Sequence, residues 1–184
     1  EAVDIAAGFA YFAGRLPRGK RIAILTPSGG SGGWMADALV AAGLELPELE
    51  AGTRARIDRH LPSYGTSVNP VDVTAQAIRE TGYALLAGLI ADSDVVDAVV
   101  VLTSARSAMI FERDQENLAR LAATSTKPVL FYSYTLPMPE PVRLLAEAGY
   151  PLFTTMPYCA RTLRVMADYR AFREDFLAAP VREN

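Results

Sequence analysis

One stretch of the sequence, residues 21–43, constrains the fold more than any other because it joins an apolar run, a cluster of glycines and a helical pattern. Ile22–Leu25 is short, apolar and followed by Pro27, as expected for a strand buried on both faces of a sheet. Four glycines occupy the five positions of Gly29–Gly33. The apolar residues that follow have the spacing of a helix packed on a sheet: Met35, Ala38, Leu39 and Ala42. Gly43 stands where the C-terminal glycine of such a helix belongs.

The glycine cluster predicts an anion site. A glycine-rich loop that leads into a helix exposes backbone N–H groups at the positive end of the helix dipole, without Cβ atoms to keep an anion away. The pattern is not a Walker loop, because no Lys-Ser/Thr pair follows Gly33. It fits a dinucleotide fingerprint poorly, because Met35 takes the place of the third glycine. A single phosphoryl group fits better than a whole nucleotide.

Two other interpretations of the same residues stay open. In the first, the glycines only make a tight turn from strand to helix and nothing binds. In the second, Gly29–Gly33 is the G-x-S-x-G elbow of a serine hydrolase with Ser31 as the nucleophile. The triad of such an enzyme needs a histidine, and His60 is the only one in the chain.

Apolar runs and amphipathic segments alternate along the whole sequence. Further strands are expected at 44–49, 95–102, 128–132 and 152–153, and residues 67–74 are expected to form a loop. Helices are expected at 2–15, 53–61, 111–123, 139–148 and 157–176, with one more around 78–89. The alternation predicts an α/β fold, a three-layer flavodoxin-like parallel sheet of five strands with helices on both faces. Ligands of such sheets bind at the carboxyl ends of the strands, where Gly29–Gly33 and the segment after Leu102 are expected to lie.

Composition limits the classes of partner. The 184 residues suffice for one core, so we expect a single domain over 1–184 that begins with a leading helix and linker at 1–20. The net charge of −3 argues against a nucleic-acid or anionic-membrane surface, and no apolar run has the length of a membrane helix. The single cysteine, Cys159, excludes an internal disulfide and favours a cytoplasmic location, and the single histidine excludes multi-histidine metal sites. Because the chain starts at Glu1 within a helical pattern, we expect it to be excised from a larger protein.

Three polar residues outside the glycine cluster are candidates for the wall of the site. Asn69 and Asp72 flank Pro70, and they either pair with the glycine loop or make local Asx turns. Arg106 follows the expected strand at 95–102, where it either reaches a phosphate or carboxylate or remains a solvated loop residue.

Several segments together resemble one family, the nucleoside-diphosphate-forming acyl-CoA synthetases, which are relatives of succinyl-CoA synthetase. The segments are TPSGGSGGWMADA at 26–38, GLELPEL at 43–49, LP at 61–62, NPVDVT at 69–74, DSDVVDAV at 92–99, KPVL at 127–130 and AGYPLF at 148–153. The resemblance runs nearly end to end, and it points to the succinyl-CoA-synthetase-like flavodoxin domain, also called the CoA-ligase domain.

The resemblance implies a module of an enzyme that reversibly makes an acyl-CoA from an acid, CoA and ATP, with release of ADP and phosphate. The phosphoryl group passes through a phosphohistidine and an acyl phosphate. The implied partners are a phosphohistidine-bearing domain, a CoA-binding domain and an ATP-grasp domain, in the same chain or on another subunit. CoA, ATP or ADP and Mg²⁺ would then belong to the full enzyme, and this domain alone would bind no cofactor or metal and would be inactive.

In the family, a helix N-terminus of this domain faces the phosphohistidine. Carried over, the phosphate-binding residues are Ser28, Gly29, Gly30, Ser31 and Gly32, with no catalytic residue in this chain. The sequence departs from many relatives at Pro27, where they have Asn, and His60 does not match the phosphorylated histidine.

The alternative from another class is a stand-alone flavodoxin-like module that binds a small anion or a phosphorylated ligand. The sequence leaves open the identity of the acid, the choice of ATP or GTP, and assembly into a homo-oligomer.

Overall fold

The fold is a five-stranded parallel sheet in the order β2-β1-β3-β4-β5, as predicted for flavodoxin-like winding. The structure is a computed structural model that describes residues 1–179. Its strands are β1 (Ile22–Thr26), β2 (Val71–Asp72), β3 (Ala98–Thr103), β4 (Val129–Ser133) and β5 (Leu152–Phe153). The central strands are continuous apolar runs because both of their faces are buried.

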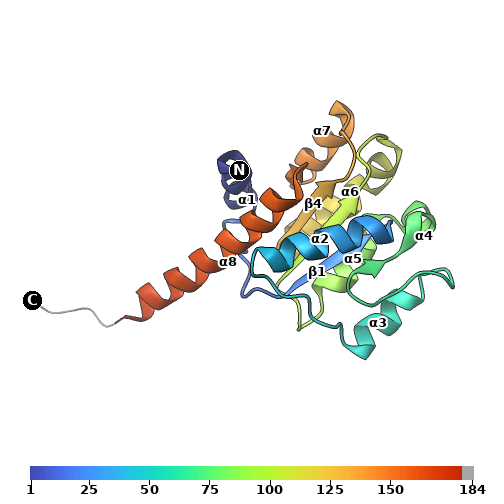
Figure 1. Cartoon of the computed structure of the whole chain (residues 1–184). Coiled ribbons are helices and arrows are strands. Elements are labelled where there is room, and N and C mark those ends of the chain that lie inside the picture. The colour runs from blue at the N-terminus through green and yellow to red at the C-terminus, as the bar shows by residue number, and fades with distance from the viewer. Residues whose placement is uncertain (180–184) are drawn as a thin grey trace, which may run out of the picture.

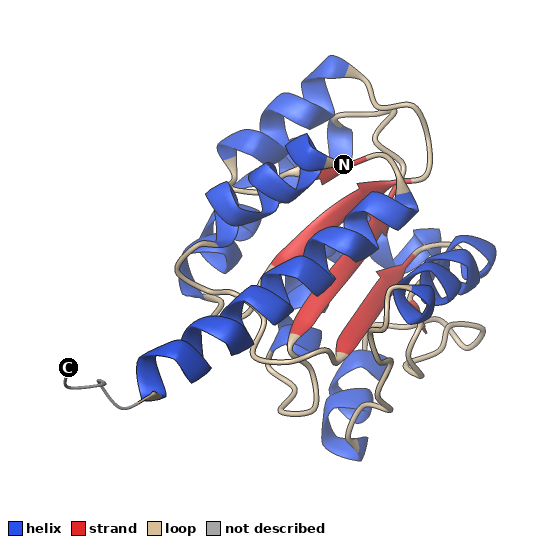
Figure 2. Ribbon diagram, turned by 60° about the vertical axis from the view of Figure 1, so that its left-hand side comes forward, coloured by secondary structure: helices blue, strands red, loops and turns tan. Residues whose placement is uncertain are grey.

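Eight helices flank the sheet in the described part of the chain. They are α1 (Ala2–Phe12), α2 (Gly29–Ala41), α3 (Ala51–Asp58), α4 (Thr74–Thr81), α5 (Tyr83–Ala91), α6 (Met109–Thr124), α7 (Pro139–Glu147) and α8 (Met156–Ala178). Helices α2 and α8 cross one face of the sheet, with α1 packed beside α8, and the C-terminal part of α8 extends beyond the sheet (Figures 1 and 2).

The core consists of two apolar layers, one on each face of the sheet. Ile22 and Ile24 of β1 point into the layer formed with α1, α2 and α8. Ala23 and Leu25, the alternate residues of the same strand, point into the layer formed with α3 to α7. The predicted three-layer architecture is therefore confirmed.

The predicted strand at 44–49 is wrong, and so is the predicted loop at Val71–Asp72. Residues 44–49 make a single bridge to the sheet, between Arg21 and Glu45. The next stretch of the edge of β1 is occupied by the side chain of Asn69, and Val71–Asp72 then pairs with Leu25 and Thr26 as β2. Pro47, which has no N–H to donate to a strand, lies in the segment that leaves the sheet.

The single helix expected around 78–89 is two helices. Gly82 separates α4 from α5 with a φ of +82°, a left-handed conformation that favours glycine. The Asp114 carboxylate of α6 accepts the backbone N–H groups of Tyr83 (2.7 Å) and Ala84 (2.8 Å) at the start of α5. A residue distant in sequence thus supplies the cap that starts the second helix.

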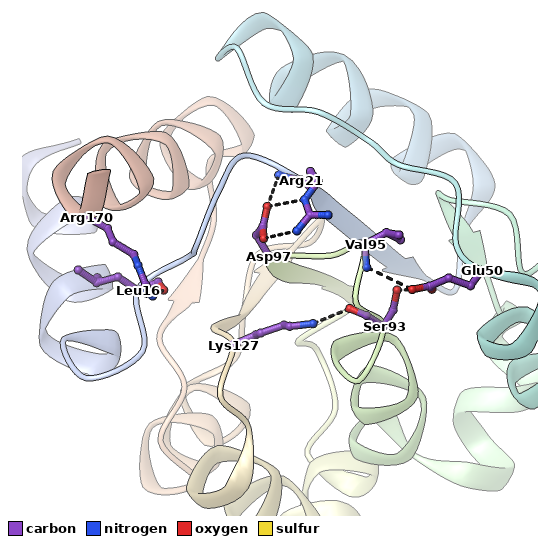
Figure 3. A network of polar contacts seen from close by, with 8 residues as sticks. All are labelled: Leu16, Arg21, Glu50, Ser93, Val95, Asp97, Lys127 and Arg170. Atoms are coloured by element: carbon purple, nitrogen blue, oxygen red, sulfur yellow. Dashed lines mark hydrogen bonds and ion pairs between the residues drawn. The ribbon is translucent and has the colours of Figure 1, made fainter. Parts of the chain in front are cut away.

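The edge of the sheet at which the strands begin is held by a polar network that joins segments distant in sequence (Figure 3). Arg21 forms a two-pronged ion pair with Asp97, with Nε–Oδ2 and Nη2–Oδ1 distances of 2.9 and 2.8 Å. Lys127 Nζ donates to the carbonyl oxygen of Ser93, and Glu50 accepts from the Ser93 hydroxyl. The strands β1, β3 and β4 are therefore tied together where they begin.

Asp97 makes the stability of this edge depend on pH. Asp97 is 3 % exposed, and burial alone would raise the pKa of its carboxyl group. The guanidinium and backbone N–H of Arg21 outweigh burial and hold this pKa below its ordinary value. A carboxyl whose pKa is lower in the folded state stabilises the fold above its unfolded pKa. That contribution disappears as the pH falls through the folded pKa.

We expect Asp97→Asn to lower the free energy of unfolding by about 2 kcal/mol at pH 7, because a charged hydrogen-bond partner of Arg21 is lost. Denaturant titrations should show the difference from the wild type shrinking below about pH 4. Asp94→Asn is the matched control, since Asp94 is exposed and makes no ion pair within residues 1–179. A wild-type difference that stays constant between neutral and acidic pH would contradict this account of Asp97.

Candidate functional site

The candidate site lies at the carboxyl end of β1, where α2 begins. Ser28 is the residue before the helix and has an extended backbone, and its carbonyl oxygen accepts the N–H of Gly32 at 3.0 Å. The glycine cluster is therefore the first turn of α2, and the loop predicted for it is wrong. The resemblance placed the helix start at Gly29, which is where the structure has it.

The backbone N–H groups of the predicted phosphate site fall into two groups. Ser28 N–H donates to Thr26 Oγ1 at 3.0 Å, and Gly32 N–H is used by the helix. The N–H groups of Gly29, Gly30 and Ser31, the first three positions of the helix, have no acceptor within residues 1–179. Three of the five predicted residues therefore offer free donors, and two of these three, Gly29 and Gly30, are exposed, whereas Ser31 is buried.

Two hydroxyl groups hold this helix start in shape. The side chains of Thr26 and Ser31 both donate to the carbonyl oxygen of Ser28, at 2.8 and 2.9 Å. Ser31 is 8 % exposed, and its hydroxyl makes no hydrogen bond to His60 in the described chain. Ser31 therefore has the environment of a structural cap, and the contacts of a hydrolase nucleophile are absent from residues 1–179.

The glycines differ in what a side chain would meet. A Cβ on Gly32 would lie 2.9 Å from Thr26 Cγ2 and 3.4 Å from Pro70 Cβ, so this glycine lets α2 pack closely on β1. A Cβ on Gly29 would lie 3.0 Å from Asp72 Oδ2. Gly30 and Gly33 face open space, with no atom within 4 Å. Close packing against Thr26 and Pro70 therefore explains Gly32, whereas Gly30 has no packing reason to be glycine.

Asn69 and Asp72 have different positions relative to the glycines. The Asn69 amide donates to the carbonyl oxygens of Ile22 (2.9 Å) and Pro47 (3.0 Å), and its oxygen accepts the N–H of Ile24 (2.9 Å). Asn69 thus replaces a strand neighbour of β1, and it pairs neither with the glycine cluster nor in a local Asx turn. Asp72 lies beside the helix start, because its Oδ2 faces Gly29.

The turn after Asp72 carries an unusual residue. Asp72 Oδ1 accepts the N–H of Thr74 at 3.0 Å, which is the Asx turn considered for Asp72. Thr74 has a φ of +66°, a strained conformation for a β-branched residue, and its buried hydroxyl has no hydrogen-bond partner among the described residues. The sequence gives no signal for this strain.

Arg106 is exposed in the loop that follows β3, at the same edge of the sheet. It makes no hydrogen bond or ion pair within residues 1–179, and nothing joins it to the glycine cluster. The base of its loop is held by buried hydroxyls: Tyr83 and Thr103 are 2.7 Å apart, and Ser133 accepts the N–H of Ala105. Burial raises the pKa of Tyr83, which keeps this phenol protonated.

Other sites are not supported in the described part of the chain. Within residues 1–179, no cluster of three or more His, Cys, Asp or Glu side chains is placed to hold a metal ion. None of the helices there has the length and apolar character that crossing a membrane requires. Cys159 is fully buried, and burial raises the pKa of its thiol, so it is a core residue of α8.

Fold and site together define a doubly wound α/β domain whose first crossover helix presents free N–H groups where the strand order reverses. The Ligase-CoA domain family matches residues 22–122, more than half of the sequence. The chain belongs to this family.

Curated relatives agree with this assignment. This chain is 39 % identical to acetate–CoA ligase [ADP-forming] II subunit alpha of Pyrococcus furiosus over 80 residues, which are 44 % of this chain and 18 % of the relative. It is also 26 % identical to acetate–CoA ligase [ADP-forming] I of Archaeoglobus fulgidus over 161 residues, which are 88 % of this chain and 23 % of that relative. The chain thus spans about a fifth of the length of these relatives.

Solved structures share the fold. A protein of Pyrococcus horikoshii OT3 superposes with a TM-score of 0.78 and 27 % identity, over 92 % of this chain and 40 % of that one. The dinucleotide forming acetyl-coenzyme A synthetase 1 of Ca. Korarchaeum cryptofilum, in complex with phosphate and ADP, has a TM-score of 0.76 and 21 % identity, over 97 % of this chain and 39 % of that one. At that identity, the second likeness concerns the fold alone.

Gly32 is closely packed and Gly30 is not, so we expect alanine at these two positions to have opposite effects on stability. Gly32→Ala should lower the free energy of unfolding by about 1–3 kcal/mol, because the added methyl group meets Thr26 and Pro70. Gly30→Ala should raise it by about 0.5–1 kcal/mol, because alanine favours the helix and its Cβ meets nothing. Chemical denaturation of the two variants checks this, and equal effects of the same sign would contradict the packing described for α2.

Proposed function

We propose that this chain is the CoA-ligase domain of an NDP-forming acyl-CoA synthetase, and that the start of α2 stabilises a phosphoryl group carried by a histidine of another domain. The observation that carries the proposal is the set of free N–H groups at Gly29, Gly30 and Ser31. Membership of the Ligase-CoA domain family and the likeness to ADP-forming acetate–CoA ligases support it.

The chemistry of the site suits a phosphoryl group. A phosphorylated side chain carries about two negative charges near neutral pH, and oriented N–H groups stabilise such charge without a cation. Phosphoryl transfer depends mostly on positioning and on charge stabilisation, so a domain contributes to it without supplying a nucleophile. The hydroxyl contacts of Thr26 and Ser31 fix the donors before the phosphoryl group arrives, so little reorganisation is needed.

The residues around the helix start favour one direction of approach for the phosphoryl group. The Asp72 carboxylate lies beside Gly29, and a negative phosphoryl group is repelled from that side. The side of Gly30 is open, with no atom within 4 Å of a Cβ placed there. The phosphoryl group therefore approaches over Gly30 and Ser31. Asn69 supports the wall by holding the edge of β1, and Arg106 is proposed to extend the wall from the loop after β3.

In the proposed full enzyme, a carboxylic acid, CoA and ATP give an acyl-CoA, ADP and phosphate through the phosphohistidine and an acyl phosphate. The phosphohistidine-bearing, CoA-binding and ATP-grasp domains are supplied in the same chain or by another subunit. Those domains would bind CoA, the nucleotide and Mg²⁺, and the enzyme would act in the cytoplasm. This domain alone is proposed to be inactive.

We expect Gly30→Ala to impair phosphoryl transfer in the enzyme assembled with these partner domains. The added Cβ leans toward the helix N-terminus, into the space left for the phosphoryl group. The N–H of residue 30 remains, but the methyl group displaces the phosphoryl group from it; because one well-placed donor contact is worth about 10²-fold in rate in comparable sites, a loss of at least about 10-fold in acid-dependent acyl-CoA formation is predicted. Phosphohistidine formation from radiolabelled ATP should fall with it.

Gly33→Ala is the matched control, because it makes the same change one turn further along α2 and also meets open space. It should leave both rates unchanged. Equal losses in the two variants, or none in either, would contradict the proposed role of the helix start. Acyl-CoA formation that never appears with the partner domains, together with tight binding of inorganic phosphate by this chain alone, would favour the stand-alone anion-binding module.

A further inference from the structure

A group of arginine side chains lies at the edge of the sheet opposite to the helix start of α2. They line a hollow of about 680 Å³ between α1, α8 and the turn at 124–126, and its walls include Tyr11, Arg15, Arg18 and Arg170. Arg18 precedes β1 and the turn precedes β4, so this hollow is at the amino-terminal edge of the strands. We refer to it as the arginine hollow.

Two of the three arginines are held in place by backbone carbonyl groups. Arg170 Nη1 donates to the carbonyl oxygen of Leu16 at 2.9 Å, a contact visible in Figure 3. Arg15 Nη1 donates to the carbonyl oxygen of Ala122 at the end of α6, and its guanidinium lies 5.2 Å from the centre of the Phe12 ring. Burial lowers the pKa of Arg15, as expected for a guanidinium that has lost part of its water.

Arg18, the third arginine of the hollow, has no partner for its charge among the described residues. Arg18 is exposed, and it forms no hydrogen bond or ion pair within residues 1–179. It also lines two neighbouring hollows along this edge, where carboxylates accompany Lys127: Glu45, Asp94 and Asp97 in one, and Asp92 and Asp94 in the other. No described carboxylate lines the arginine hollow itself. Glu174 bonds Arg170 Nε at 2.7 Å from outside the lining, so positive charge remains in excess.

We propose that the arginine hollow binds a phosphate-bearing anion of mononucleotide size or smaller. Guanidinium groups match the oxygens of a phosphate in pairs, and partly desolvated ones attract an anion more strongly than solvated ones. A volume of about 680 Å³ is in the range of small-ligand sites and exceeds what a lone phosphate fills. The inference does not depend on the proposed function, because the two sites are on opposite edges of the sheet.

Two kinds of ligand carry such a phosphate group: a polyphosphate alone, or a nucleotide, which also has a base. Tyr11 distinguishes them, because its side chain, 37 % exposed, lies in the wall and offers a ring on which a base stacks. Sodium pyrophosphate and ADP are therefore the two probes. Tighter binding of ADP that is lost in Tyr11→Ala assigns the site to a nucleotide, and equal binding of both probes assigns it to the polyphosphate group.

The test is a titration of the ¹⁵N-labelled 184-residue chain with each probe, followed through the amide signals. Signals of residues 124–127 should shift with saturation at millimolar concentrations or below. Arg18→Gln should weaken binding at least about fivefold, because one guanidinium is removed without loss of any contact in the fold. Arg79→Gln is the control, since Arg79 is exposed on α4 and forms no ion pair within residues 1–179, and it should bind like the wild type.

Two results would overturn the proposal. One is the absence of shifts at residues 124–127 at millimolar concentrations of both probes. The other is equal binding by Arg18→Gln and the wild type. Shifts confined to Gly29–Ser31 are a case of the first result, and they leave the proposed function of α2 intact, so failure of one proposal is distinguishable from failure of the other.

Discussion

The carbonyl group of Ser28 is the contact on which the candidate site depends. It accepts the N–H of Gly32, which starts α2, and it also accepts the hydroxyl groups of Thr26 and Ser31. One oxygen atom therefore joins the end of β1 to the first turn of the helix. The Gly32 N–H is bonded to this carbonyl group, and the Ser28 N–H donates to Thr26 Oγ1, so the three donors between them stay free at a fixed position.

The edge of β1 is what places this helix start at the surface of the domain. Three different groups cover that edge in turn: the Glu45 backbone, the Asn69 side chain and the short strand β2. The last of these brings Asp72 beside Gly29, where we propose that its carboxylate limits the approach of an anion to the other side. Structural residues thereby determine the shape of a site in which they do not take part chemically.

Much of the fold follows from the sequence because burial on both faces leaves a clear pattern. The strands β1, β3, β4 and β5 are apolar runs that were predicted to within a few residues. The strand β2 was missed because it has two residues, follows a proline and contains an aspartate. The alternation at 44–49 was misleading, since Leu44 and Leu49 are buried without belonging to a strand. Pairing along β1 is decided there by Asn69, a residue distant in sequence.

The site was predictable at the level of residues but not of atoms. Four glycines after a buried strand predict where an anion can meet backbone N–H groups. Whether the Ser28 N–H is free depends on the rotamer of Thr26, whose hydroxyl oxygen accepts it, and spacing does not reveal this rotamer. The strain at Thr74 and the position of Asp72 beside Gly29 arise from tertiary contacts and were likewise beyond the sequence.

The most direct measurement of the central claim uses the amides of this helix start as their own controls. A peptide that carries phosphohistidine is titrated into the ¹⁵N-labelled chain, and the signals from Ser28 to Gly32 are followed. The account predicts large downfield shifts for Gly29, Gly30 and Ser31 and small ones for Ser28 and Gly32, whose N–H groups are already bonded. Equal shifts at all five positions, or none at the three free ones, would contradict it.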